Sequence, residues 1–64
     1  MRITVNGQPR ELPTGATLAT VAADRPGPGT AVALNGAVIR AAEWSATRLT
    51  EADRVEVVMP MQGG

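Results

Sequence analysis

The residues with the clearest capacity for chemistry are the last two, Gly63 and Gly64. A terminal α-carboxylate is ionised above a pKa of about 3.5, so its oxygen can attack the α-phosphate of ATP and form an acyl-adenylate. A sulfur or nitrogen nucleophile can then take the acyl carbon, because the adenylate is a good leaving group. Glycine has no Cβ and suits a tail that must enter a narrow cleft. The alternative is a frayed end without a chemical role.

Residues 60–64 form the expected flexible Gly-Gly tail, and residues 1–59 form the single expected domain. Five extended residues span at most about 17 Å, which is enough to reach a partner's ATP site while the domain stays outside. Met61 lies beyond the last predicted strand and favours a partner contact. Gln62 is equally consistent with a hydrogen bond to the partner and with a solvated position.

The side-chain inventory argues against an independent enzyme. Cys, His, Lys and Tyr are absent and Ser45 is the single serine, so thiolate, imidazole and amine chemistry is excluded. The carboxylates form no recognisable pair. We therefore expect no metal site, no catalytic residue and no bound cofactor.

From charge and hydropathy, we expect a soluble, cytoplasmic protein. The 64 residues carry a formal net charge of zero without a charged block, so nothing indicates nucleic acid or a membrane surface as partner. The first residues lack the apolar run of a signal peptide, and no stretch approaches the length of a membrane span.

Two Asn-Gly pairs predict hairpins. Residues 2–5 alternate polar and apolar side chains as a half-buried strand does, and Asn6-Gly7 leads into a second strand at 8–12. Pro9 places that strand at a sheet edge, since proline cannot donate to a ladder. Asn35-Gly36 joins strands at 30–34 and 37–40 in the same way.

A helix is predicted from a cap at Thr17 to about residue 24, with an apolar stripe of Leu18, Val21 and Ala22. Residues 41–53 are less regular, with Leu49 as a core plug and Trp44 as a lid rather than a binding aromatic. We expect an α+β fold: a mixed sheet of four to five strands, with one helix packed across it. The first and last strands should lie parallel at its centre.

The last strand, predicted at 54–59, contains the candidate docking residues. Val55, Val57 and Met59 share one face, so Met59 favours the core over a partner contact. Val58 points the other way and is either part of a docking face or an isolated exposed apolar residue. Val58 and Met59 are the two residues of this strand that could form a docking face, although the alternation favours the core for Met59. Arg54 and Glu56 should be solvated.

Several segments together resemble the ThiS family of thiamine-biosynthesis sulfur carriers, ubiquitin-like β-grasp proteins of the MoaD/ThiS superfamily. The resemblance covers nearly the whole chain, and its most specific segments are Ala33-Leu34-Asn35-Gly36, Glu43-Trp44 and Gln62-Gly63-Gly64 in this order. The weaker matches are residues 3–7, 10–12, 16–18 and 53–58, together with Val32 and Val38. The Pro- and Gly-rich stretch 25–29 departs from the family, which often keeps more helix there.

The resemblance implies a function. A ThiF-type adenylyltransferase would adenylate Gly64 with ATP and Mg. Sulfur from a desulfurase relay would convert the adenylate to a thiocarboxylate, and a ThiG-type thiazole synthase would accept that sulfur. Alternatives are a MoaD-like or other carrier for molybdopterin or cysteine synthesis, and a β-grasp interaction module or modifier without sulfur chemistry. The short loops favour the thiamine branch.

Overall fold

Seven short elements make up the fold in the computed structural model, which describes residues 1–25 and 29–59. They are β1 (Arg2–Val5), β2 (Gln8–Glu11), α1 (Leu18–Ala22), β3 (Ala31–Leu34), β4 (Ala37–Ile39), the 3₁₀ helix η1 (Ala41–Ala46) and β5 (Arg54–Val58). Residues 26–28 and 60–64 lie outside the described residues, so the predicted tail is not among them.

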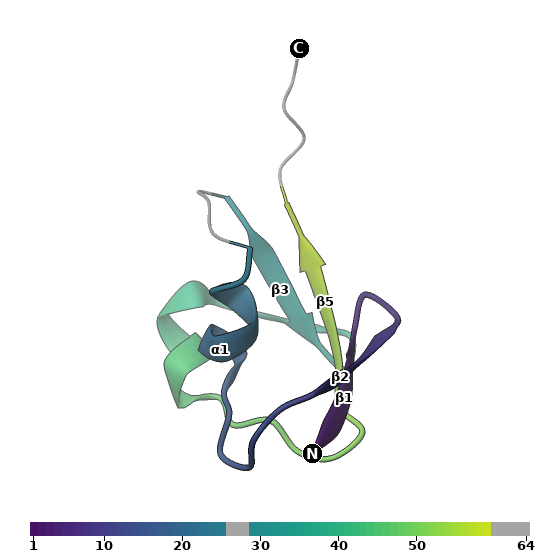
Figure 1. Ribbon diagram of the computed structural model, residues 1–64. Coiled ribbons are helices and arrows are strands. Elements are labelled where there is room, and N and C mark those ends of the chain that lie inside the picture. Colours follow the sequence, from purple (N-terminus) through teal and green to yellow (C-terminus); the bar gives the residue numbers. More distant parts are fainter. Residues whose placement is uncertain (26–28, 60–64) are drawn as a thin grey trace.

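The strands form one five-stranded sheet in the order β2-β1-β5-β3-β4 (Figure 1). β1 and β5 are parallel, and the other neighbours are antiparallel. The predicted pairing of the first and last strands is thus confirmed, with β5 in the centre. β2 is an edge strand, as Pro9 predicted, and both Asn-Gly pairs are tight turns whose asparagines have φ near 50°.

One face of the sheet packs against α1 and η1 (Figure 1). Alternate residues of the strands point into this core, because side chains of a strand alternate between its faces. The helix contributes Leu18 and Val21, both fully buried, and Leu49 fills the core as expected. The buried cluster is Ile3, Val5, Leu12, Ala16, Leu18, Val21, Ala22, Val32, Leu49, Val55 and Val57. The α+β prediction is confirmed.

The helix is shorter than predicted and ends at Ala22 instead of about residue 24. Thr17 is its N-cap as expected. After the bond from Ala23 N–H to the Ala19 carbonyl, Asp24 and Arg25 donate to carbonyls only three residues back. The chain therefore tightens into a 3₁₀-type turn before Pro26, since a residue that precedes proline is disfavoured in α conformation.

Two further predictions concern the second half of the chain. The stretch predicted to be irregular begins with η1, where Trp44 is half-buried against the core and its indole N–H donates to the Ile39 carbonyl at 2.8 Å. Trp44 is therefore a lid, as expected. The core assignment of Met59 is wrong: β5 ends at Val58, one residue early, and Met59 is 49% exposed.

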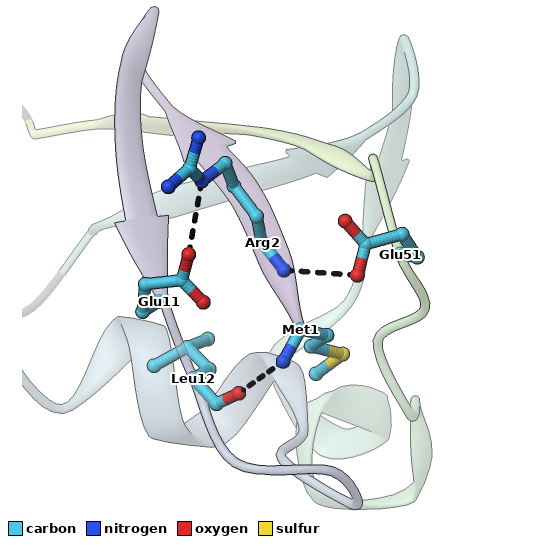
Figure 2. A network of polar contacts seen from close by, with 5 residues as sticks. All are labelled: Met1, Arg2, Glu11, Leu12 and Glu51. Carbon is cyan, nitrogen blue, oxygen red and sulfur yellow. Dashed lines mark hydrogen bonds and ion pairs between the residues drawn. The ribbon is translucent and has the colours of Figure 1, made fainter.

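The beginning of β1 is tied to β2 and to the turn before β5 (Figure 2). The N-terminal ammonium of Met1 donates to the Leu12 carbonyl at 2.8 Å. The Arg2 main-chain N–H donates to Glu51 Oε1 at 3.1 Å, and its guanidinium pairs with Glu11 at 2.9 Å. These bonds fix the end of the sheet where β5 starts, opposite the end where β5 finishes.

Candidate functional site

The candidate site lies where β5 ends and the chain continues toward its C-terminal carboxylate. Four of the predicted site residues, Met61, Gln62, Gly63 and Gly64, lie outside the described residues. The two described ones, Val58 and Met59, are 64% and 49% exposed. Apolar side chains this open at the end of a central strand are available for contact with another protein.

Strand register brings Val58 together with apolar residues of β3 and β4 on the outer sheet face, opposite α1. Ala31 is the partner of Val58, and Ala33 is the partner of Val38. Val38 is 75% exposed. We call Ala31, Ala33, Val38 and Val58 the apolar sheet face.

Sequence reasoning did not place Val38 in the candidate docking face, although a signal for this position was present. The two-residue turn at Asn35-Gly36 fixes the hairpin register so that Leu34 pairs with Ala37 and Ala33 with Val38. Val38 therefore had to share a face with Ala33. Ala33 pairs on its other side with Glu56 of β5.

The β1 half of the same outer face is polar. Arg54 and Glu56 are exposed, as predicted, and Thr4 lies between them and β2. A shallow depression here is lined by Thr4, Asn6, Gly7, Arg54, Val55 and Glu56. The outer face is thus divided into an apolar part over β3, β4 and the end of β5, and a charged part over the start of β5.

Asn6 extends the contact between β1 and β5 beyond the last residue of β1. Its main-chain N–H donates to the Val55 carbonyl at 2.9 Å. Its side chain then accepts a hydrogen bond from Val57 N–H at 2.8 Å and donates to the Val57 carbonyl at 3.2 Å. One amide side chain therefore satisfies both main-chain polar groups of Val57 three residues before Pro60.

The side chain of Asn35 also makes two hydrogen bonds, at the start of β5. Its side-chain oxygen accepts from Arg54 N–H at 2.9 Å, and its side-chain nitrogen donates to Asp53 Oδ1 at 3.1 Å. The central strand is thus held at both ends by asparagines of the two hairpin turns.

The Asp53 carboxylate completes the turn that leads into β5. Burial raises the pKa of Asp53, but hydrogen bonds from the Thr50 main-chain N–H and from the side chains of Asn35 and Thr50 lower it more. The pKa therefore lies below the ordinary value of an aspartate, because three donors face the charged form. The Asp53 carboxylate thus connects the turn at Thr50 to the hairpin turn at Asn35.

Comparison with known proteins identifies the family. The sequence model of the ThiS family matches residues 3–64 of this chain. The chain belongs to the ThiS family. The match runs through Gly64, so it includes the tail residues that lie outside the described part of the structure.

A solved structure of the ThiS family supports the same conclusion. The chain is similar to the crystal structure of the thiamine biosynthesis protein ThiS from Geobacter metallireducens, with a TM-score of 0.81 and 28% sequence identity over 100% of both chains. No curated protein matches the sequence. The likeness confirms the ubiquitin-like β-grasp fold for this member of the ThiS family.

Within the described residues of this ThiS-family chain, no three His, Cys, Asp or Glu side chains are grouped so that they could hold a metal ion. The same part of the chain contains no helix long and apolar enough to cross a membrane. What the described surface offers is the apolar sheet face together with Met59, next to the start of the tail.

Proposed function

We propose that this ThiS-family chain is a sulfur carrier in thiamine biosynthesis, with Gly64 as the residue that is modified. The observation that carries the proposal is the family match, which extends over the terminal Gln62-Gly63-Gly64. The similar protein from Geobacter metallireducens is a thiamine biosynthesis protein, which favours the thiazole branch. The chain would act as a protein co-substrate rather than an enzyme.

The proposed chemistry has two steps. A carboxylate oxygen of Gly64 attacks the α-phosphorus of ATP, presented with Mg by a ThiF-type adenylyltransferase, and pyrophosphate leaves. A sulfide-level nucleophile then attacks the acyl carbon, so that a C–S bond forms, the C–O bond to AMP breaks and AMP leaves. The product is a thiocarboxylate, which would pass its sulfur to a ThiG-type thiazole synthase.

In this proposal, the domain surface binds the enzyme and the tail undergoes the chemistry. The apolar sheet face and Met59 would dock on the adenylyltransferase, and Met61 to Gly64 would enter its ATP site. Val38 and Val58 are 75% and 64% exposed, and burying such side chains contributes about 25 cal/mol for each Å² of apolar surface removed from water. Docking would hold the domain while the chemistry takes place on the tail.

The test is the intact mass of the chain after incubation with a ThiF-type enzyme, MgATP and sulfide. The mass should rise by the difference between one sulfur and one oxygen atom, and fragmentation should place the change at Gly64. A variant that lacks Gly63 and Gly64 is the matched control and should keep its original mass.

An unchanged mass for the native chain, with the enzyme shown to be active on another carrier, would contradict the proposal. Adding a ThiG-type thiazole synthase then tests the branch. Loss of sulfur from the carrier with formation of thiazole supports the thiamine assignment, whereas a retained thiocarboxylate points to a carrier for another pathway.

A further inference from the structure

On the β1 side, the last described contact of β5 is made by a side chain, that of Asn6, and not by a paired strand. The parallel ladder pairs Thr4 with Arg54 and Val5 with Val55, and β1 then ends. Evenly spaced bonds of a parallel ladder would continue from Val57 N–H to the main-chain oxygen of Asn6. Because Asn6 has already turned to a φ of 51°, its side-chain oxygen accepts this bond instead.

This contact lies on the β1 side of β5, opposite the side on which β5 pairs with β3 of the proposed docking face. On the β3 side, β5 is paired through Val58, whereas on the β1 side Val57 depends on the Asn6 amide. Without it, both polar groups of Val57 would lack their partners, and β5 would be held along one edge only at its C-terminal end. The direction in which the chain leaves the sheet would then be less well defined.

We infer that Asn6 is a positioning residue that fixes the direction of the carboxyl end of β5, so that a docked carrier presents its terminal carboxylate to the activating enzyme. The inference rests on the proposed function. It predicts an effect on the rate of activation after docking rather than on docking itself, because Asn6 belongs to the β1–β2 turn and not to the apolar sheet face. Small misplacements of a reacting group reduce rates strongly.

The two Asn-Gly turns provide a matched pair of variants. Asn6→Gly and Asn35→Gly each remove two side-chain hydrogen bonds at one end of β5, and each keeps the bond from its own main-chain N–H. Glycine accepts the positive φ of both positions without strain. The variants therefore differ in which end of β5 they release.

The experiment measures adenylation of the carrier by ATP–pyrophosphate exchange with a ThiF-type enzyme, with the carrier as the varied substrate. Asn6→Gly should lower kcat by about tenfold and leave KM within about twofold. Asn35→Gly should leave both constants near those of the native chain. Amide hydrogen exchange should become faster by about tenfold or more at Val57 in the first variant and at Arg54 in the second.

Each outcome decides a specific point. Equal kcat values for the two variants, or an unchanged kcat for Asn6→Gly despite faster exchange at Val57, would refute the inference and leave the proposed function intact. No exchange with the native chain would refute the proposed function and this inference with it. If Asn6→Gly does not fold, Asn6→Asp replaces it, because it keeps the acceptor for Val57 N–H but sets a carboxylate oxygen against the Val57 carbonyl. It should also lower kcat and leave KM within about twofold, and an unchanged kcat would refute the inference.

Discussion

At the residue scale, side chains of the two hairpin turns connect those turns to the central strand by hydrogen bonds. The asparagines at 6 and 35 were predicted as turn formers because they tolerate positive φ. The structure shows that their amides also bind β5 at Val57 and Arg54. A domain of this size buries only about 60% of the surface of its unfolded chain, so a few polar contacts of this kind weigh heavily in its stability.

Ala52 is the residue with the clearest backbone strain, because its φ is 71°. A Cβ in this region costs about 1–2 kcal/mol, and glycine loses about 0.5–1 kcal/mol more chain entropy on folding. Ala52→Gly should therefore raise the free energy of unfolding by about 0.5–1 kcal/mol. Ala23, with a φ of −62°, provides the control.

Urea denaturation of both variants checks this prediction. Ala23→Gly should lower the free energy of unfolding by about 0.5–1 kcal/mol, since that position has no strain to relieve. The same sign for both variants would contradict the assignment of strain to Ala52.

Asp53 should make the fold sensitive to acid. Its pKa is lower in the folded chain than the ordinary 3.8, so its contribution to stability is complete above the unfolded pKa and is lost as pH falls through the folded pKa. Between about pH 5 and pH 3, the free energy of unfolding should decrease less in Asp53→Asn than in the native chain.

Thermal unfolding at a series of pH values measures this difference. At neutral pH the Asp53→Asn variant should be less stable by about 1 kcal/mol, because it lacks the charged acceptor for its three donors. Parallel acid profiles for the two proteins would show that other groups cause the acid sensitivity.

At the scale of elements, packing rather than propensity holds each piece in place. α1 has only five residues, and isolated helices this short are not stable in water. Its buried face meets the sheet through Leu18 and Val21, both fully buried. The strands are three to five residues long and are ordered by their neighbours in the same way.

Two Val→Ala substitutions remove the same groups at a buried and at an exposed site, so they test how burial affects the free energy of unfolding. Val21→Ala removes two methyl groups from a fully buried site of α1 and should cost about 2–3 kcal/mol. Val38→Ala removes the same groups from a site that is 75% exposed and should change stability by about 0.5 kcal/mol or less.

Differential scanning calorimetry checks this contrast. The Tm of the Val21→Ala variant should fall by roughly 15–20 °C. A comparable loss in Val38→Ala would mean that β4 relies on Val38 for its own stability, contrary to the placement of this residue on the outer face.

At the scale of the whole molecule, the two faces of the sheet differ in what covers them. One face is covered by α1 and η1 (Figure 1) and contains the core. The other contains the apolar sheet face, beside the end of β5. The central strand β5 ends at Val58, which pairs with Ala31 of the apolar sheet face. In the proposed function, the outer face would dock on the activating enzyme while Gly64 is modified.

Charge placed on the apolar sheet face should weaken docking on the activating enzyme. Val58→Asp should raise the KM of the carrier in adenylation by about tenfold, which corresponds to roughly 1.4 kcal/mol of binding free energy. Ala42→Asp adds the same charge at an exposed site of η1 on the opposite side and should leave KM unchanged.

Steady-state pyrophosphate exchange again provides KM and kcat, with circular dichroism to confirm that both variants are folded. Equal KM values for the two variants would exclude the apolar sheet face as the docking surface.

The sequence by itself determined the hairpins, the edge position of β2, the pairing of the first and last strands and the resemblance to the ThiS family. Asn-Gly pairs, Pro9 and strict alternation are local signals, and local chemistry alone decides turns and sheet faces. Only the tertiary structure decided that Val38 joins Val58, that Met59 lies outside the core, and that the amide of Asn6 holds Val57. These facts depend on where strands end and on which backbone groups then lack a strand partner. Both are decided only when segments distant in sequence pack together, such as Ala31 with Val58 and Asn6 with Val57.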